Sequence, residues 1–477
     1  MLVSQGGLFQ LVQSTSLFKY SSYISKKLPV KDLCLKEKDK ELYDILQEEK
    51  RRQYEGIELI ASENYAGKAV LQCLGSHLAN KYSEGYPNKR YYGGNQFIDK
   101  VETLAMNRAL KAFRLSQKEW GINVQPYSGS PANLAVYTGV LGPRGKMMGL
   151  LLSHGGHLTH GFQTPKKKVS ASSLFFTSQQ YTIDPETGVV DMEKLDREAS
   201  EFKPKLIIMG GSAYPRDWDY EGFRQIADKV GAYLMADISH IAGLIAAGLQ
   251  NDPFKYCDIV TSTTHKTLRG PRAGMIFYSK KKGKFLGNAI NGAVFPGLQG
   301  GPHDHQIAAI ACQMKEVASP LYHKYAKQVI KNSKALAKYL LDNGCRLSSG
   351  GTDNHLVLWD VKPLGINGAQ LEKTLELVDI SCNKNTIAGD RSAVIPGGVR
   401  IGTPAVTSRG MKECDIIQIG KFLMRGVKIT QKYGDKKKKE FERLIVQDEE
   451  IPLFKNDVIR FARQFPVPGI DPSSLLH

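Results

Sequence analysis

The chain has 477 residues, of which 42% are hydrophobic and 23% are charged, and its formal net charge is +18. This length exceeds what one small core accommodates, and the composition is typical of a globular protein, so we expect two domains and an additional arm. No stretch reaches the roughly 18–20 uninterrupted apolar residues of a membrane helix, which excludes a membrane-spanning chain. The seven cysteines are scattered without a CxxC pair, which predicts reduced thiols in a reducing compartment, no disulfide scaffold and no metal site.

The positive charge is compatible with binding to nucleic acid, but its distribution along the chain does not favour that function. Much of the excess is dispersed, and two basic clusters lie at the chain ends, in an acid-free N-terminus and at residues 436–439. Such runs are most often solvated tails or helix faces, and a cationic surface also suits a polyanionic small substrate. We find no basic face interleaved with aromatic residues. Nucleic-acid binding is therefore not required, although it could coexist with another function.

Residues 1–31 resemble an organellar targeting leader. They contain four lysines, many serines and no acidic residue before Asp32. Acidic-poor, serine-rich, basic leaders are typical of transit peptides, although arginine is absent here. The segment predicts import into a mitochondrion or another organelle, and the alternative is an unstructured extension of a cytoplasmic protein.

The first third of the chain alternates helical and irregular segments. Residues 39–53 are charged and helical in character, and residues 57–65 look extended. A Gly-, Pro- and Tyr-rich segment at 81–94 breaks regular structure, and apolar residues at 101–113 recur at helical spacing.

The middle of the chain alternates short apolar strands with helix-length segments. This pattern predicts an α/β fold with a mainly parallel mixed sheet sandwiched by helices, in which ligands bind at the carboxyl ends of the strands. The expected strands are 122–125, 206–209, 233–236, 259–262 and 275–278.

A long helical stretch at 323–341 leads into a second α/β region with a strand at 356–359. We therefore predict four parts: a leader at 1–31, an N-terminal arm at 32–70, a large ligand-binding domain at 71–320 and a small C-terminal domain at 321–477.

The first chemical signal follows the strand at 122–125. Ser128, Gly129 and Ser130 precede Pro131, a good first helical residue. Small hydroxyl residues at a helix start, with glycine allowing close backbone approach, predict a phosphate-binding cradle. The alternative is an ordinary helix cap. The segment is neither a Walker loop nor a dinucleotide fingerprint.

Two further signals follow later strands. Asp237 ends an apolar strand and could hold a cationic ring nitrogen, although it could also be a helix N-cap. Lys266 follows a buried strand, where desolvation and nearby cations would favour the neutral amine that forms a Schiff base. The alternative is a loop lysine in a phosphate site. Together, a phosphate cradle, an aspartate and a lysine on successive strand ends predict a pyridoxal 5′-phosphate site.

Several sequence strings then identify a family. From about Asp39 to beyond Lys432 the chain resembles serine hydroxymethyltransferases, which implies an aspartate-aminotransferase-like large domain (fold type I) and a homodimer or homotetramer with shared active sites. The matching strings are IELIASEN (57–64), NKYSEGYP (80–87), RYYGG (90–94), NVQPYSGSPAN (123–133), HGGHLTHG (154–161), ADISHIAGL (236–244), TTHKTLRG (263–270), VFPGLQGGP (294–302), NKNT (383–386) and VRIGTPA (399–405).

The resemblance implies a role for each residue of a cofactor site. Lys266 would carry pyridoxal 5′-phosphate covalently, with Thr263 as a catalytic hydroxyl beside it, Asp237 on the ring nitrogen and His157 stacked on the ring. The remaining cofactor contacts would be the phosphate ligands Ser128, Gly129, Ser130 and His265, Ser212 near the ring hydroxyl, His240 as a supporting contact, and Tyr82, Gly300 and Gly301 from the neighbouring subunit.

The resemblance also implies the substrate site. Arg400 would bind the substrate carboxylate through its bidentate guanidinium, assisted by Ser62. Glu84, Tyr91 and Tyr92 would lie beside the reacting carbon, with Glu84 and Tyr92 in catalytic roles. The positions that resemble tetrahydrofolate contacts are Leu152, Gly156, Leu158 and Asn385.

Three departures from the family pattern are visible. Ala388 stands where members commonly have proline, Pro215 follows SAY where many have a small polar residue, and DISH (237–240) replaces the commoner DMAH. None removes a catalytic group, so the departures bear on loop geometry and kinetic detail.

The implied reaction transfers the hydroxymethyl carbon of serine to tetrahydrofolate and leaves glycine. Serine would displace Lys266 from the cofactor, Arg400 would anchor it, and Glu84 would donate and accept the proton. A retro-aldol route and direct displacement are both compatible with these residues. The nearest rivals are a threonine aldolase or an α-oxoamine synthase, which share the aspartate and lysine but not the SEGYP and NKNT positions.

Overall fold

The computed structural model describes residues 32–281, 284–390 and 395–475, so the predicted leader at 1–31 lies outside the described residues. The chain divides into two compact units, one holding residues up to 52 together with 475 onward, and the other holding 53–474. The first unit contains α2 (Leu35–Lys38) and most of α3 (Lys40–Glu55). Within the described residues, no helix combines the length and apolar character that crossing a membrane requires.

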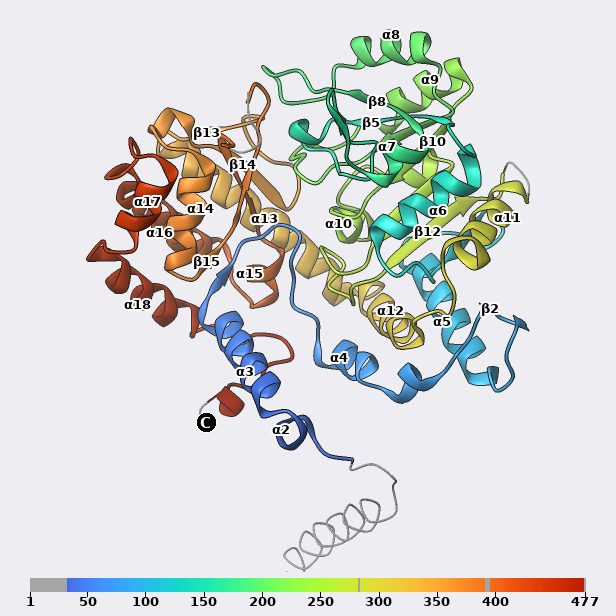
Figure 1. Cartoon of the computed structure of the whole chain (residues 1–477), viewed down its shortest axis with the longest axis horizontal. Coiled ribbons are helices and arrows are strands. Elements are labelled where there is room, and N and C mark those ends of the chain that lie inside the picture. The colour runs from blue at the N-terminus through green and yellow to red at the C-terminus, as the bar shows by residue number, and fades with distance from the viewer. Residues whose placement is uncertain (1–31, 282–283, 391–394, 476–477) are drawn as a thin grey trace, which may run out of the picture. The chain divides into compact units, whose positions relative to one another are not determined.

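A seven-stranded sheet organises the larger unit (Figure 1). Its order is β4-β12-β11-β10-β9-β5-β8, and only β12 runs antiparallel to its neighbours. This arrangement confirms the predicted α/β class with a mainly parallel mixed sheet. The strands are β4 (Trp120–Asn123), β5 (Lys146–Leu150), β8 (Thr177–Tyr181), β9 (Leu206–Met209), β10 (Tyr233–Asp237), β11 (Ile259–Thr263) and β12 (Gly274–Ser279).

Alternate residues of each strand enter different cores because successive strand side chains point to opposite faces. In β9, Leu206 and Ile208 belong to one core, whereas Ile207 and Met209 belong to the other. Helices α6 (Gly129–Leu141) and α11 (Phe285–Gly292) line the first core. The second core is lined by α5 (Gln96–Ala112), α8 (Met192–Phe202), α9 (Tyr220–Val230), α10 (Ala242–Ala246) and α12 (Asp304–Val317).

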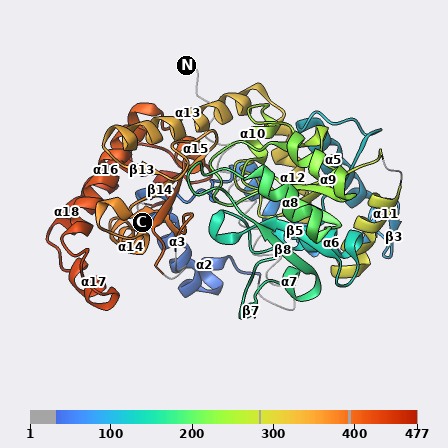
Figure 2. The same cartoon turned by 90° about the horizontal axis from the view of Figure 1, so that it is seen from above.

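A second, antiparallel sheet has the order β13-β14-β17-β16 and its own core. Figure 2 shows its strands β13 and β14 apart from β5 and β8 of the large sheet. Helix α13 (Pro320–Asp342) joins the two regions, because its first half packs into the large sheet's core and its second half into this one. Ile57 and Leu59 also pack here, where β1 (Ile57–Glu58) pairs with β15 (Ile380–Ser381). The other elements are β13 (Arg346–Leu347), β14 (Leu356–Asp360), β16 (Asn383–Asn385), β17 (Gly398–Gly402), α14 (Gly368–Leu377), α15 (Pro404–Ser408), α16 (Glu413–Gln431), α17 (Lys438–Ile445) and α18 (Glu450–Ala462).

Shorter elements complete the larger unit. The hairpin β2 (Gly85–Tyr86) and β3 (Lys89–Arg90) lies within the segment predicted to lack regular structure, and helix α4 (Lys68–Leu74) precedes it. A second hairpin joins β6 (Gln163–Thr164) to β7 (Lys167–Lys168), and α7 (Ala171–Phe175) follows it.

The structure reproduces all five expected central strands within about two residues and adds two that were not expected, β5 and β8. β8 has the sequence TSQQY and lies at the edge of the sheet, so it lacks the apolar run that marks a buried strand. β5 contains a glycine and follows a Gly- and Pro-rich turn, which weakens the same signal.

Candidate active site

A cavity of about 460 Å³ lies where the carboxyl ends of the parallel strands meet β17 of the second sheet. Twelve of the predicted site residues line it. They are Ser62, Ser128, Gly129, Ser130, His157, Ser212, Asp237, His240, Thr263, His265, Lys266 and Arg400. Five lining residues were not predicted: Glu63, His160, Gly211, Ser239 and Arg272.

One end of the cavity is built to receive an anion. Ser128 precedes α6 in an extended conformation, and its side chain makes no capping bond to the helix. The N-terminus of a helix of this length offers backbone N–H groups and a positive dipole end. A side chain at Gly129 would overlap Thr263, since an added Cβ would lie 2.7 Å from its Cγ2 atom. Arg272, also at the cavity wall, adds positive charge.

Asp237, which also lines the cavity, is held as a carboxylate. His160 Nε2 and Asn133 Nδ2 donate to its Oδ2 at 3.0 and 2.9 Å, and the Ser239 hydroxyl donates to its Oδ1 at 2.6 Å. Burial alone would raise the pKa of Asp237, but the hydrogen bond and charge of His160, followed by His157 and Ser239, outweigh it and hold the pKa far below its usual range. Asp237 is therefore an ionised group suited to a cationic ring nitrogen.

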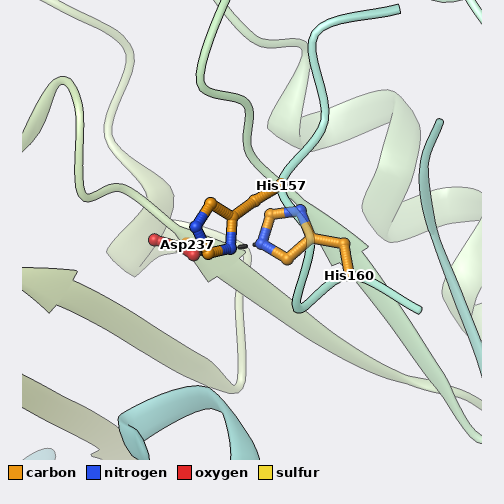
Figure 3. A group of neighbouring side chains, drawn as sticks. All are labelled: His157, His160 and Asp237. Carbon is orange, nitrogen blue, oxygen red and sulfur yellow. Dashed lines mark hydrogen bonds and ion pairs between the residues drawn. The ribbon is translucent and has the colours of Figure 1, made fainter. Parts of the chain in front are cut away.

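His157 and His160 lie beside this carboxylate (Figure 3). Burial, with a smaller contribution from His160, lowers the pKa of His157 to about 4, so its ring is neutral at pH 7. The His157 Nδ1 atom contacts the Thr159 hydroxyl at 2.7 Å, and Asn133 donates to that same hydroxyl. One ligand atom from each of His157, His160 and Asp237 falls within 4.8 Å of the others, a spacing that could hold a metal ion. Here Asp237 Oδ2 is already engaged by His160 and Asn133.

Lys266 reaches the cavity from the loop after β11. Its Nζ donates to the Thr263 hydroxyl at 3.1 Å. Burial lowers the pKa of Lys266 to about 8; Asp237 acts in the opposite direction, while Arg400 and Arg272 lower it further. A substantial fraction of this amine is neutral near pH 8, as a nucleophilic lysine requires.

Arg400, on β17, is a buried cation whose hydrogen-bond partners are all neutral groups. Its guanidinium donates to the Ser212 carbonyl at 2.7 Å and to the Asn383 side-chain oxygen at 3.0 Å, and it lies 3.5 Å from the Ser62 hydroxyl. Burial lowers its pKa to about 10, so it stays charged at pH 7. A buried cation with neutral neighbours favours an anionic ligand, because such a charge is costly without a partner.

Two buried histidines support this region. His240 Nδ1 lies 3.2 Å from His355 Nε2, and burial lowers the pKa of both rings, to about 3 for His355. The neighbouring Lys266 and Arg400 lower both values further, so both rings are neutral. Sequence reasoning found His240 but missed His355, which carries no local motif signal.

Six predicted residues form a separate cluster that does not line the cavity. The Tyr82 and Tyr92 rings meet edge to face with centroids 5.3 Å apart, and half or more of each of Tyr82, Tyr91 and Tyr92 is exposed. An added Cβ on Gly300 would lie 3.0 Å from a Glu84 carboxylate oxygen, and one on Gly301 would lie 3.1 Å from the Tyr82 ring. We call the segment 82–92 with 300–301 the hairpin cluster.

Three of the four predicted folate positions lie in the segment after β5, and the fourth, Asn385, ends β16. Leu152 begins a short 3-10 turn, and Leu158 is 46% exposed. The Thr386 hydroxyl donates to the Ser153 carbonyl at 3.2 Å, which brings the two segments together. Gly156 has no room for a side chain, because an added Cβ would lie 2.0 Å from the Leu150 carbonyl oxygen.

The chain matches proteins of known family over most of its length. The family profile described as serine hydroxymethyltransferase matches residues 35–423. Serine hydroxymethyltransferase 3, chloroplastic, of Arabidopsis thaliana is 51% identical, covering 94% of this chain and 86% of the relative. The enzyme of Bombyx mori is 53% identical (91% and 97%), and the cytosolic enzyme of Oryctolagus cuniculus is 51% identical (91% and 94%).

The chain belongs to the serine hydroxymethyltransferase family. Members of this family are pyridoxal-phosphate-dependent transferases of one-carbon units that interconvert serine and glycine with tetrahydrofolate, and they are typically oligomeric. Named relatives include a chloroplastic and a cytosolic form.

The residues of the cavity fit this cofactor. The Ser128 hydroxyl lies at a helix start but makes no capping hydrogen bond to the helix. The buried His265 Nδ1 has no hydrogen-bond partner among the described residues. Both atoms are therefore available to a phosphate group, next to Arg272. In the same cavity, ionised Asp237 matches a protonated ring nitrogen, and Lys266 is an amine with a lowered pKa.

Proposed function

We propose that this chain transfers the hydroxymethyl carbon of serine to tetrahydrofolate, giving glycine and 5,10-methylenetetrahydrofolate, with pyridoxal 5′-phosphate held covalently by Lys266. The observation that carries the proposal is the convergence of Lys266, ionised Asp237 and buried Arg400 on one cavity. When bound, the cofactor supplies an electron-withdrawing ring that stabilises negative charge at the substrate α carbon.

The cofactor would be held by the groups that line the cavity. Asp237 would keep the ring nitrogen protonated, because a carboxylate fixed by His160, Asn133 and Ser239 keeps its charge in a buried site. The neutral His157 ring would stack on the cofactor ring. The phosphate would be bound by Ser128, Gly129, Ser130 and His265, with Ser212 near the ring hydroxyl and His240 in support.

Arg400 would bind the substrate carboxylate, with Ser62 assisting. Its guanidinium is already oriented by Ser212 and Asn383, so little side-chain freedom is lost when the carboxylate binds. Lys266 would also accept and return protons, because a pKa of about 8 leaves about one tenth of the amine neutral at pH 7 and half of it neutral at pH 8. Thr263 accepts a hydrogen bond from its amine.

The hairpin cluster would complete the active site of a second copy of the chain. Its exposed tyrosines lie outside the cavity of their own chain, and exposed aromatic clusters of this kind favour protein interfaces. Tyr82, Gly300 and Gly301 would contact the partner's cofactor phosphate. Glu84 would exchange a proton with the serine hydroxymethyl group and the folate, and Tyr91 and Tyr92 would flank the reacting carbon. The folate would lie against Leu152, Gly156, Leu158 and Asn385.

The decisive experiment follows the fate of serine labelled at its hydroxymethyl carbon, using purified protein loaded with pyridoxal 5′-phosphate. Conversion of serine to glycine should require tetrahydrofolate, and the label should then appear in the folate. Glycine formation from serine at the same rate without tetrahydrofolate would instead support an aldolase, and condensation with an acyl thioester would support an α-oxoamine synthase.

Residues 1–31 are proposed to direct the protein to an organelle. Fusing them to a fluorescent reporter should place the reporter in a mitochondrion or another organelle. A uniformly cytoplasmic reporter would favour the alternative, an extension without targeting function.

A further inference from the structure

One arginine, Arg90, is hydrogen-bonded to the backbone on both sides of Glu84. A single guanidinium nitrogen of Arg90, Nη1, donates to the carbonyl of Ser83 at 2.9 Å and to the carbonyl of Gly85 at 2.9 Å. These carbonyls belong to the residues immediately before and after Glu84. The Tyr91 N–H donates to the carbonyl of Glu84 itself at 3.0 Å. All three consecutive carbonyls are therefore fixed from the opposite strand of the hairpin.

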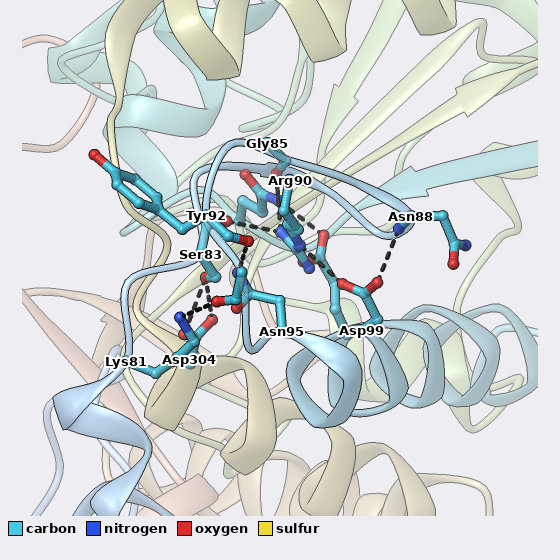
Figure 4. A network of polar contacts seen from close by, with 12 residues as sticks. Lys81, Ser83, Gly85, Asn88, Arg90, Tyr92, Asn95, Asp99 and Asp304 are labelled. Carbon is cyan, nitrogen blue, oxygen red and sulfur yellow. Dashed lines mark hydrogen bonds and ion pairs between the residues drawn. The ribbon is translucent and has the colours of Figure 1, made fainter.

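The other side of the same guanidinium is anchored on helix α5 (Figure 4). Arg90 Nε donates to Asp99 at 2.9 Å, and Arg90 Nη2 donates to Glu102 at 2.6 Å. The Arg90 side chain is only 4% exposed and that of Glu102 only 2%. Burial opposes the charge on Arg90, but Glu102 and Asp99 outweigh it and raise the pKa of Arg90. The planar guanidinium thus joins the helix rigidly to the backbone at Glu84.

Two further contacts hold the same short segment. The Ser83 hydroxyl lies 2.7 and 2.9 Å from the two carboxylate oxygens of Asp304, the first residue of α12. Gln125 donates to the Gly85 carbonyl and to Glu102, each at 2.9 Å. Ser83 and Gly85 are buried, whereas Glu84 between them is not. The backbone is fixed while the Glu84 carboxylate is left outside the network.

We propose that Arg90 is a positioning residue for Glu84, which it holds at a fixed place relative to the reacting carbon in the partner's cavity. This inference rests on the proposed proton-transfer role of Glu84. A lysine at position 90 could keep one charge contact, but it cannot bridge both carbonyls and both carboxylates at once. Small displacements of a proton donor are costly, since about 1 Å of misplacement can reduce a rate on the order of 10²-fold.

The test compares Arg90→Lys with wild type in the full-length, cofactor-loaded enzyme. Folate-dependent conversion of serine should fall roughly 10–10²-fold in kcat. Cofactor content and folate-independent cleavage of a bulky 3-hydroxy amino acid should fall by no more than about threefold, because neither depends on the proposed proton transfer through Glu84. Arg224→Lys is the matched control: Arg224 also contacts two carboxylates, Asp228 and Asp258, and a backbone carbonyl, but on α9.

A double-mutant cycle with Glu84→Gln separates positioning from general support of the fold. If Arg90 acts through Glu84, adding Arg90→Lys to Glu84→Gln should cost less than about twofold more. Additive losses, or equal losses of both activities, would overturn the inference. Glu84→Gln alone tests the role of Glu84, so failure of the proposed function is visible separately. If Arg90→Lys does not fold, Asp99→Asn, which weakens the anchor of Arg90 on α5, replaces it in the same cycle, with the same outcomes deciding.

Discussion

The cavity and the hairpin cluster differ in how the protein treats their functional groups. In the cavity, Asp237, His157 and Lys266 are enclosed, and their pKa values are moved far from the ordinary range by burial and by one another. In the hairpin cluster, half or more of each of Tyr82, Tyr91 and Tyr92 is exposed. Its buried guanidinium, that of Arg90, donates hydrogen bonds to backbone carbonyls.

The two regions therefore control different properties of their side chains, protonation state in one and position in the other. The cavity sets protonation states, which needs desolvation and fixed charges within one chain. In our proposal the hairpin sets the position of the Glu84 carboxylate, which would act in a second copy of the chain, and this needs a rigid backbone and an exposed side chain. The following predictions test whether the two regions divide the work in this way.

Replacing Lys266 with alanine should abolish multiple turnover while the protein stays folded, because the role of this lysine is chemical. Tyr82→Ala should also reduce turnover, because it alters the hairpin cluster. In verified heterodimers of the two variants, one of the two sites would combine an intact cavity with an intact hairpin, so activity should recover to roughly half of wild type. Heterodimers without any recovery would mean that each site is built from one chain.

Asp237→Asn should reduce kcat about 10²–10³-fold, because it removes the charge opposite the ring nitrogen while keeping a similar shape. Steady-state kinetics at saturating cofactor would measure the loss. Asp217→Asn, a partly buried carboxylate away from the cavity, is the control. A variant within a few-fold of wild type would remove Asp237 from its assigned role.

Glu84→Gln should reduce folate-dependent turnover of serine by about 10²-fold, the usual loss when a general acid–base group is removed. Cofactor binding and folate-independent cleavage should survive, because the cavity is intact. Parallel assays of both activities make the comparison. If both activities and cofactor occupancy fell together, Glu84 would be structural.

Lys266 of the cofactor-free protein should titrate about two pH units below an ordinary lysine. Only the neutral amine reacts with an acylating reagent, and a pKa of about 8 leaves half of it neutral at pH 8. Labelling at Lys266, quantified by mass spectrometry against exposed Lys166 in the same digest, should therefore be half-maximal near pH 8. A midpoint above pH 10 would contradict the desolvation of this lysine.

Ser239→Ala should have the smallest effect, a roughly 3–10-fold loss in cofactor affinity or kcat. It removes one hydrogen bond to Asp237 but leaves those from His160 and Asn133. The pKa of Asp237 should rise yet stay well below neutrality. Cofactor titration by absorbance would measure the change, and a loss as large as that of Asp237→Asn would show that Ser239 does more than adjust the carboxylate.

The sequence by itself determined the strand ends and the reactive groups on them. β9 was predicted at its observed bounds, Asp237 ends a strand with a marked apolar run, and Lys266 follows a strand that begins with two apolar residues. A polar group directly after a buried strand is a local pattern, visible within about ten residues. The family strings also placed Arg400 and Glu84 in functional roles, although the strings carry no information on which side chains touch.

Only the tertiary structure decided what surrounds these groups. His160 and Asn133 reach Asp237 across 77 and 104 residues, and Arg400 meets Ser212 across 188. Arg90 bonds to residues close to it in sequence, but its hydrogen bonds to the two carbonyls that flank Glu84 depend on the hairpin register and on the packing of α5. Protonation and position arise from such contacts, because a pKa depends on burial and nearby charges and a fixed backbone depends on its hydrogen-bond partners.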